Sequence, residues 1–373
     1  MRLAGTCLFS LLLLTSCNKG SVEVEPAKTS TTPKWSWKTT SQTQLNLTGD
    51  LVTVAGYDSV YGAHDDIGSY ATFDTLNGIT YDGSFIYVTD ISNNSIRKIN
   101  IQTAEVTTVA GHSGESVSVD GIGPAAKFGG PWAITTDGKF LYVTDQFTHT
   151  IRKVEIATNR VTTIAGSPNV VGNADGIGTS ARFDHPSGIV TDGEVLYIGD
   201  YNNSTIRKLD LSTNMVTTFA GATGDSGTSD GPAALARFRN PDGLTMDENH
   251  LYVADSAGNT IRRIELKTGY VRTIAGDPLA SSGHVNGRGR AARFQNPWAL
   301  TNDSTYIYVA ENSCTIRKVH KQTWDVSTVT GVHSSCSSVD GPKDTARLQT
   351  VYGMTAVNNN LYFFGYGTIR RVD

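Results

Sequence analysis

The chain has 373 residues, of which 18% are charged and 38 are glycine, and its formal net charge is -4. Charged residues of both signs are interspersed and not gathered in basic runs, so the positively charged surface that nucleic-acid-binding proteins need is not expected. The composition fits a soluble, glycine-rich all-β protein.

Residues 1–17, MRLAGTCLFSLLLLTSC, have the pattern of an export signal, with Arg2 near the start and an apolar run over Leu8–Leu14. The segment LTSC, which ends at Cys17, resembles the bacterial lipobox. That resemblance implies cleavage before Cys17 and acylation of its thiol. Two or three acyl chains give stable membrane anchoring, whereas one is marginal. The alternative is an ordinary secretory signal that contains a cysteine by chance.

Asn18 follows the cysteine, at the position where many lipoproteins retained in the inner membrane have aspartate. We therefore expect a bacterial outer-membrane lipoprotein that faces the periplasm or the cell surface. Residues 18–50 are rich in Ser, Thr, Lys and Pro and show no sustained period, which predicts a flexible tether. Its roughly 30 residues reach at most ~100 Å when extended, enough to hold a globular head away from the bilayer.

Beyond the tether, a unit of four short strand-like segments is repeated. In Gly188–Gly221 the segments are GIVT, VLYIG, TIRKL and MVTTFAG, each bounded by turn residues. The glycine that ends the fourth segment recurs every 55 residues, at Gly56, Gly111, Gly166, Gly221, Gly276 and Gly331. Four strands in each unit and a constant period are typical of a β-propeller.

The number of units predicts how the ring closes. Five units are complete, and a sixth begins at Gly353 but ends before a fourth strand. The missing strand, LVTVAG, is present at Leu51–Gly56. We therefore predict an all-β protein, with residues 51–373 forming a six-bladed β-propeller of four-stranded antiparallel blades, closed by pairing strand 51–56 with the C-terminal blade. An open solenoid, the alternative, would leave both fragments unpaired.

The blade pattern resembles the NHL repeat. Its elements are P-x-G-I before the first strand, L-Y-V-x-D at the second and N-x-x-I-R-K at the third, and the match covers roughly residues 51–373. The resemblance implies a propeller fold. The family includes scaffolds, ligand-binding proteins and a few lyases, so the fold alone does not predict an activity.

Residues that recur in every blade are expected to serve the blade, because a chemical site in a propeller normally occurs once. One acidic residue ends the second strand of each of the five complete units: Asp90, Asp145, Asp200, Asp255 and Glu311. A metal-binding ring is one interpretation, but we favour hydrogen bonds to the turn that follows. We expect the repeated Arg-Lys pair of the third strand to lie at solvated edges and to form pairs between blades.

The linkers between blades also recur, as DGIGPAAKF from Asp120, DGIGTSARF from Asp175, DGPAALARF from Asp230, NGRGRAARF from Asn286 and DGPKDTARL from Asp340. The pattern predicts a tight turn, one short helical turn and an aromatic plug between blades. Calcium binding is an alternative, although each linker has only one or two carboxylates.

We expect the binding site at the channel mouth, on the face that carries the long loops. Candidate residues are those that differ between blades where the chain enters the innermost strand: Asn77, Trp132, His185, Ser187, Asn240, Asp242, Asn296, Trp298 and Tyr352. Aromatic faces and amides suit a protein, peptide or glycan ligand. The alternative for Trp132 and Trp298 is packing beneath the loops.

An enzyme is the alternative function. Some lyases with this fold hold zinc through three histidines, but the eight histidines here do not recur at one blade position. A lactonase-like site would need a glutamate that the candidate ring lacks. We therefore predict no catalytic residue, metal or cofactor, and expect a monomeric binding or scaffolding protein, with a metal-dependent lyase or lactonase-like hydrolase as the alternative.

The cysteines predict one covalent link. Cys7 leaves with the signal and Cys17 takes lipid, so Cys314 and Cys336 remain. Both lie in loops of the fifth blade on the same face, and the expected compartment is oxidising. We therefore predict a disulfide between Cys314 and Cys336.

Overall fold

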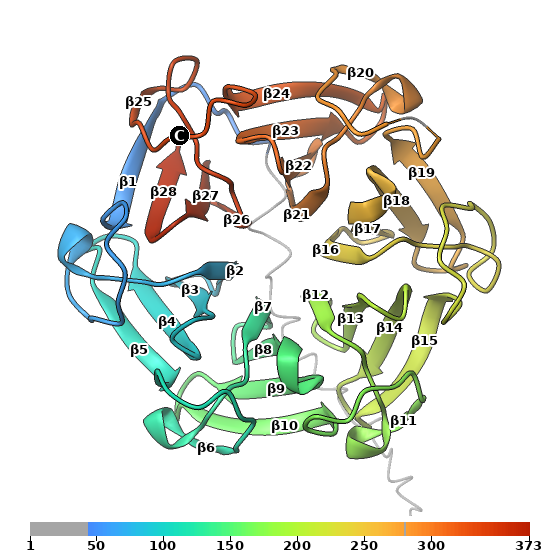
Figure 1. Ribbon diagram of the computed structural model, residues 1–373, viewed down its shortest axis with the longest axis horizontal. Coiled ribbons are helices and arrows are strands. Elements are labelled where there is room, and N and C mark those ends of the chain that lie inside the picture. The colour runs from blue at the N-terminus through green and yellow to red at the C-terminus, as the bar shows by residue number, and fades with distance from the viewer. Residues whose placement is uncertain (1–43, 280) are drawn as a thin grey trace, which may run out of the picture. The chain divides into compact units, whose positions relative to one another are not determined.

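A computed structural model describes residues 44–279 and 281–373, which form six antiparallel sheets arranged as a ring (Figure 1). The expected signal peptide with Cys17, and the expected tether as far as residue 43, lie outside the described residues. Within the described part, no helix is both long and apolar enough to span a membrane.

Each sheet is one blade, and in blades one to five the four main strands run from the central channel to the rim in chain order. Blade one contains β2 (Leu76–Tyr81), β3 (Phe85–Asp90), β4 (Ser95–Asn100) and β5 (Val106–Gly111). Blade two contains β7 (Pro131–Thr136), β8 (Phe140–Asp145), β9 (Thr150–Glu155) and β10 (Arg160–Gly166). Blade three contains β12 (Pro186–Thr191), β13 (Val195–Asp200), β14 (Thr205–Asp210) and β15 (Met215–Gly221).

The other three blades follow the same order. Blade four contains β16 (Pro241–Met246), β17 (His250–Asp255), β18 (Thr260–Glu265) and β19 (Val271–Ala275). Blade five contains β21 (Pro297–Asn302), β22 (Tyr306–Glu311), β23 (Thr315–His320) and β24 (Asp325–Gly331). Blade six contains β26 (Gly353–Val357), β27 (Asn360–Gly365) and β28 (Thr368–Val372).

The ring closes through the N-terminal strand, as predicted. Strand β1 (Asp50–Gly56) pairs antiparallel with β28, in a register that runs from Leu51 opposite Val372 to Gly56 opposite Thr368. Contact with the ring begins before this strand, because Leu45 is buried and its backbone N–H donates to Asp303 Oδ2 at 2.9 Å. Residues 45–49 of the expected tether therefore lie against the propeller.

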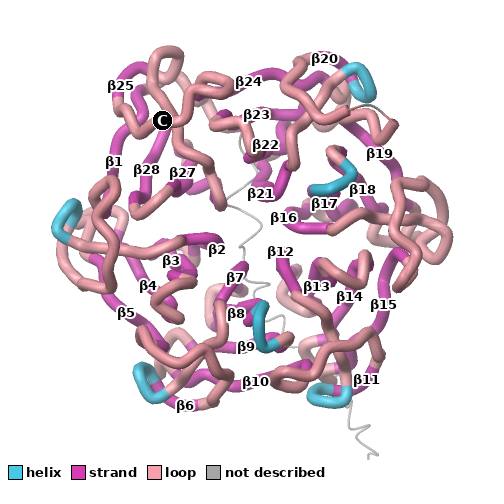
Figure 2. Tube along the Cα trace, in the orientation of Figure 1, coloured by secondary structure: helices cyan, strands magenta, loops and turns pink. Residues whose placement is uncertain are grey.

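Four blades are wider than predicted. Two-residue strands from the linkers pair with the outermost strand of blades two, three, five and six: β6 (Gly121–Ile122), β11 (Gly176–Ile177), β20 (Gly287–Arg288) and β25 (Gly341–Pro342). Short 3-10 turns accompany the linkers, visible at the rim in Figure 2: η2 (Gly68–Tyr70), η3 (Gly123–Ala125), η5 (Gly178–Ser180) and η7 (Gly289–Ala291). The linker therefore covers the outer edge of the blade that follows, which protects it from further pairing.

The core lies between neighbouring blades. In one of its six apolar clusters, Tyr87 and Ile96 of blade one pack against Leu141 and Val143 of blade two around Phe128. The corresponding linker residues are all fully buried: Phe73, Phe128, Phe183, Phe238, Phe294 and Leu348. These side chains are the plugs that the repeat predicted.

The repeated arginines are buried, which contradicts the expectation of solvated edges. Arg207 is 1% exposed and donates to Asp200 Oδ2 and to the linker carboxylate of Asp175, both at 2.8 Å, while its guanidinium lies over the Phe183 ring. The same arrangement recurs at Arg97, Arg152 and Arg262. The sequence showed the period of the charges but not that the linker folds over them and supplies their partners.

Candidate functional site

The two sets of long loops meet on one face, as predicted. The loop between the second and third strands of one blade contacts the chain entering the next blade. His149, after the 3-10 turn η4 (Gln146–Thr148), accepts a hydrogen bond on Nδ1 from the His185 backbone N–H at 3.1 Å. Figure 1 shows the innermost strands β2, β7, β12, β16, β21 and β26 around the central channel.

A small cavity of about 70 Å³ lies at the centre, where the six innermost strands begin. Five of the nine candidate residues line it: Asn77, Trp132, Asp242, Trp298 and Tyr352. Glycines line much of the remaining wall, and a side chain at Gly188 or Gly243 would collide with the backbone of the next blade. The inner strands are thus packed too closely for more than a very small ligand to enter.

Two of the lining residues interact across the channel. Trp132 of blade two and Asp242 of blade four both line the cavity, and Asn77 Nδ2 donates to the Trp132 carbonyl at 3.2 Å. Burial raises the pKa of Asp242 to about 7, against the lowering effect of the Trp132 side chain. Asp242 therefore changes its charge near neutral pH.

The mouth carries an aromatic cluster between blades five and six. The rings of Trp298 and Tyr352 stack with centroids 5.4 Å apart, and Tyr366 meets Tyr352 edge-on at 5.5 Å. The Tyr352 hydroxyl donates to the Tyr366 hydroxyl at 2.7 Å, and Trp298 Nε1 donates to the Val351 carbonyl. Tyr366 is 42% exposed and was not among the candidates, because it lies in a turn that the shortened sixth unit does not align with the others.

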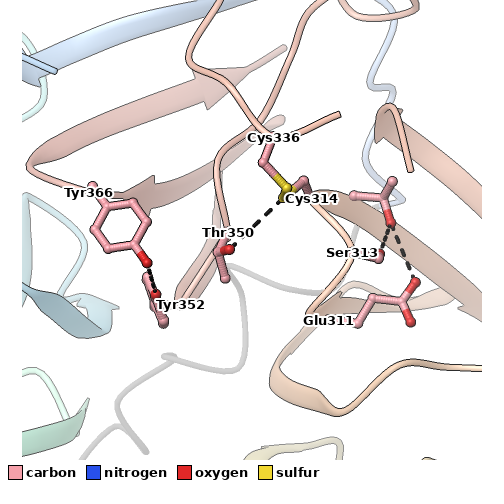
Figure 3. The surroundings of a disulfide bond; sticks show 8 residues. Glu311, Ser313, Cys314, Cys336, Thr350, Tyr352 and Tyr366 are labelled. Carbon is pink, nitrogen blue, oxygen red and sulfur yellow. Dashed lines mark hydrogen bonds between the residues drawn. A yellow bond between two sulfur atoms is a disulfide. The ribbon is translucent and has the colours of Figure 1, made fainter. Parts of the chain in front are cut away.

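The disulfide lies beside this cluster (Figure 3). Cys314 and Cys336 are bonded, with Cα atoms 5.4 Å apart. Cys314 also contacts Thr350 Oγ1 at 3.9 Å, just before Tyr352. The bond therefore fixes two loops of blade five next to the chain that enters blade six.

The other four candidates do not line the cavity. Ser187 is fully buried and donates to the Pro241 carbonyl at 2.9 Å. Asn240 donates to the Tyr201 carbonyl, and the Asn296 backbone N–H donates to Asn259 Oδ1. These three residues hold adjacent blades together, which a comparison of sequence positions alone does not reveal. His185 lies in the loop layer above the channel, 39% exposed.

His185 belongs to a cluster with the spacing of a metal site. Potential ligand atoms of His149, Asp184 and His185 lie within 4.8 Å of one another. His185 Nδ1 is 2.7 Å from Asp184 Oδ1, and Asn202 Nδ2 approaches both. Burial and the neighbouring His185 lower the pKa of His149, which keeps its imidazole neutral.

At the equivalent positions of other blades, different residues form the same kind of hydrogen bond. Asn94 Oδ1 accepts from the Gly130 N–H, as Asn259 does from Asn296 and His149 does from His185. In blade one, Ser92, Thr75 and Asp74 form a hydrogen-bonded chain like that of Asn202, His185 and Asp184. Blade packing therefore accounts for these contacts without a metal.

The larger cavity of the described residues lies on the opposite face, where the short turns are. Its volume is about 620 Å³, and it is lined mainly by turns of blades four and five. None of the nine candidates lines it. Loop length gives no sign of this cavity, because the loops on this face are the shortest of the propeller.

Comparisons with known proteins agree with the fold. No family model matches the sequence. Human NHL repeat-containing protein 2 is 28% identical over 321 residues, which is 75% of this chain and 44% of that protein. The chain thus spans less than half the length of this relative.

Two crystal structures of proteins from Bacteroides thetaiotaomicron VPI-5482 are similar. A structural genomics protein of unknown function gives a TM-score of 0.66 at 20% identity, over 86% of this chain and 75% of that one. An auxiliary nutrient binding protein gives 0.65 at 17% identity, over 87% and 76%. At these identities the likeness establishes the propeller fold alone.

Proposed function

Because the chain is a six-bladed β-propeller of the NHL-repeat type, we propose that it is a monomeric, lipid-anchored binding module of the bacterial outer membrane. Its ligand is a protein, peptide or glycan that lies on the long-loop face. The observation that carries the proposal is the aromatic cluster of Trp298, Tyr352 and Tyr366 at the channel mouth. The fold neighbour described as a nutrient binding protein is consistent with a binding role.

The geometry favours a ligand that lies across the mouth. The central cavity of about 70 Å³ is far smaller than an ordinary ligand pocket of ~300–1,000 Å³. A second aromatic pair, Trp132 with Phe147, stands on the other side of the mouth with centroids 6.4 Å apart, and Phe147 is 49% exposed. Two aromatic groups on opposite sides suit an extended chain of sugars or amino acids.

The position of residues 45 and 46 supports a ligand site on the long-loop face. Leu45 and Asn46 donate backbone hydrogen bonds to Asp303 and Asn359, which lie in turns on the short-turn face. These described residues therefore join the propeller on the short-turn face, which leaves the long-loop face open to a partner.

The enzyme alternative has less support. Among the described residues that line the central cavity, Asp242 is the one carboxylate. A lactonase-like site needs several converging acidic and amide groups, and a zinc lyase needs three histidines on one ion. The cluster that contains His149 and His185 offers two, with one imidazole nitrogen already bonded to backbone.

Binding of the mature protein to a glycan and peptide array tests the proposal. Trp298→Ala and Tyr352→Ala should each lower the signal of the ligands that the wild type retains. Tyr270→Ala is the matched control, because Tyr270 is 40% exposed beside Arg272 in a turn of the opposite face and lines neither cavity. Equal binding by wild type and both mouth variants would refute a site at this aromatic cluster.

A further inference from the structure

The cavity on the short-turn face has the size of a small-molecule site. Its volume of about 620 Å³ falls within the range of ~300–1,000 Å³ that is usual for ligand pockets. Its walls come from the turn after β16, the turn after β21, and the side chains of Tyr252, Arg263 and Lys321. The cavity therefore lies between blades four and five.

Blade five departs from the repeat at this wall. Lys321 directly follows β23, where the other complete blades have the aliphatic residues Ile101, Ile156, Leu211 and Leu266. Asn302 ends β21, where the other blades have Tyr81, Thr136, Thr191, Met246 and Val357. Lys321 and Asn302 of blade five thus occupy positions where the residues of the other blades pack in the core or form the turn.

The two exceptional residues touch each other. The Asn302 amide is oriented so that its oxygen accepts a hydrogen bond from Lys321 Nζ at 2.8 Å and its nitrogen donates one to the Met246 carbonyl at 3.3 Å. Lys321 Nζ also lies 3.3 Å from Asp247 Oδ2, and its side chain is 11% exposed. Burying an ammonium group where an aliphatic residue would fit is costly. A blade-specific cost of this kind is typical of a functional site.

Several polar groups of the wall are already committed to the fold. Asp303 accepts from the backbone of Thr305 and Tyr306, from the Tyr308 hydroxyl and from Leu45. These bonds hold the turn rigid, so the cavity is formed before a ligand arrives.

Other groups remain able to meet a ligand. Arg263 lines the cavity, and its guanidinium carbon lies 5.3 Å from the centroid of the Trp324 ring. Lys321 has a third ammonium hydrogen beyond its two bonds. Asp192 uses Oδ1 for its own turn, which leaves Oδ2 as an acceptor, and Ser304 adds a hydroxyl. Donors and acceptors of both signs therefore line one space.

We propose that this cavity binds a neutral, polyhydroxylated ligand, namely a short oligosaccharide. Hydroxyl groups both donate and accept, so they can satisfy Arg263, Lys321 and Asp192 together. An anion would face Asp192, Asp247 and Glu248, and a cation would face Arg263 and Lys321. The site is independent of the long-loop face and does not rest on the function proposed there.

Saturation-transfer NMR of the mature protein with a panel of neutral disaccharides tests this site, followed by titration calorimetry of any that bind. Lys321→Leu restores the residue type of the other blades, so the fold should remain intact. We expect this variant to lose binding about tenfold or more while its melting temperature stays equal or rises. Lys318→Leu, three residues earlier on the same blade, is the matched control, because Lys318 lies over Tyr306 outside the cavity.

Each result decides the proposal. It is supported if Lys321→Leu and Asn302→Thr weaken binding while Lys318→Leu, Trp298→Ala and Tyr352→Ala leave it unchanged. It is overturned if no neutral disaccharide binds, if uronic acids or amino sugars bind more tightly, or if the mouth variants alone reduce binding.

Discussion

Trp132 in blade two and Asp242 in blade four line the same central cavity, where the Trp132 side chain acts on the Asp242 carboxylate and lowers its pKa. Asp242, whose pKa is raised, thus lies in the central cavity that the inner strands of all six blades line.

The first prediction concerns the pH dependence of stability. The pKa of Asp242 is about 7 when folded and ~3.9 in an unfolded chain. Between about pH 4 and 7 the folded state therefore binds more protons at this group, and stability falls as the pH rises through that window. Asp242→Asn should lack this part of the fall, as measured by urea unfolding from pH 4 to 8. Parallel profiles for both proteins would show that Asp242 titrates normally.

The second prediction concerns the buried arginines. Arg207→Met leaves Asp200 buried without its partner, and should cost about 3–5 kcal/mol of unfolding free energy. Arg370→Met is the matched control, because Gly365 stands at the acidic position of its blade and its partner Asp340 is partly exposed. Denaturant unfolding should show a smaller loss for Arg370→Met. Equal losses would mean that packing, and not the stranded carboxylate, sets the cost.

The third prediction concerns the disulfide. Thiol titration of the denatured, unreduced mature protein should find no free thiol from Cys314 or Cys336. Replacing both with serine should lower stability by roughly 3 kcal/mol, since the bond closes a loop of 22 residues. Binding at the mouth should weaken as well, because the bond fixes the loops beside Tyr352. A variant with unchanged stability would contradict the first of these effects.

The fourth prediction concerns membrane attachment. Cys17→Ala should abolish incorporation of radiolabelled palmitate and release the protein into the soluble envelope fraction. Cys7→Ala is the control, because Cys7 lies inside the expected signal and should leave labelling intact. Retention of the label in Cys17→Ala would reject the lipobox interpretation.

The repeat made the ring predictable from sequence. The glycine period, the incomplete sixth unit and the spare strand at Leu51–Gly56 together fixed six blades and the closing pair. A residue's position in the repeat did not predict whether it is buried. Arg207 follows polar turn residues, which suggests exposure to solvent. In the structure the preceding linker folds over Arg207 and buries it.

The candidate site was predictable to a similar degree. Comparing blades selected Trp132, Asp242 and Trp298, which do line the channel, but also Ser187, whose hydroxyl bonds inward to the next blade. The same comparison on the short-turn face singles out Lys321, because the other complete blades have an aliphatic residue at its position. The sequence therefore contains a signal for this site that does not depend on loop length.

The pairing of β1 with β28 has a consequence for the folding of the newly made chain. The ribosome makes β1 before any strand of blades one to five, whereas its partner β28 is made after all of them. Blades one to five can form in order of synthesis, but β1 stays without this partner until β28 has been made, since the contact joins distant parts of the sequence. Until then the nascent chain carries an exposed strand that is able to pair with other molecules.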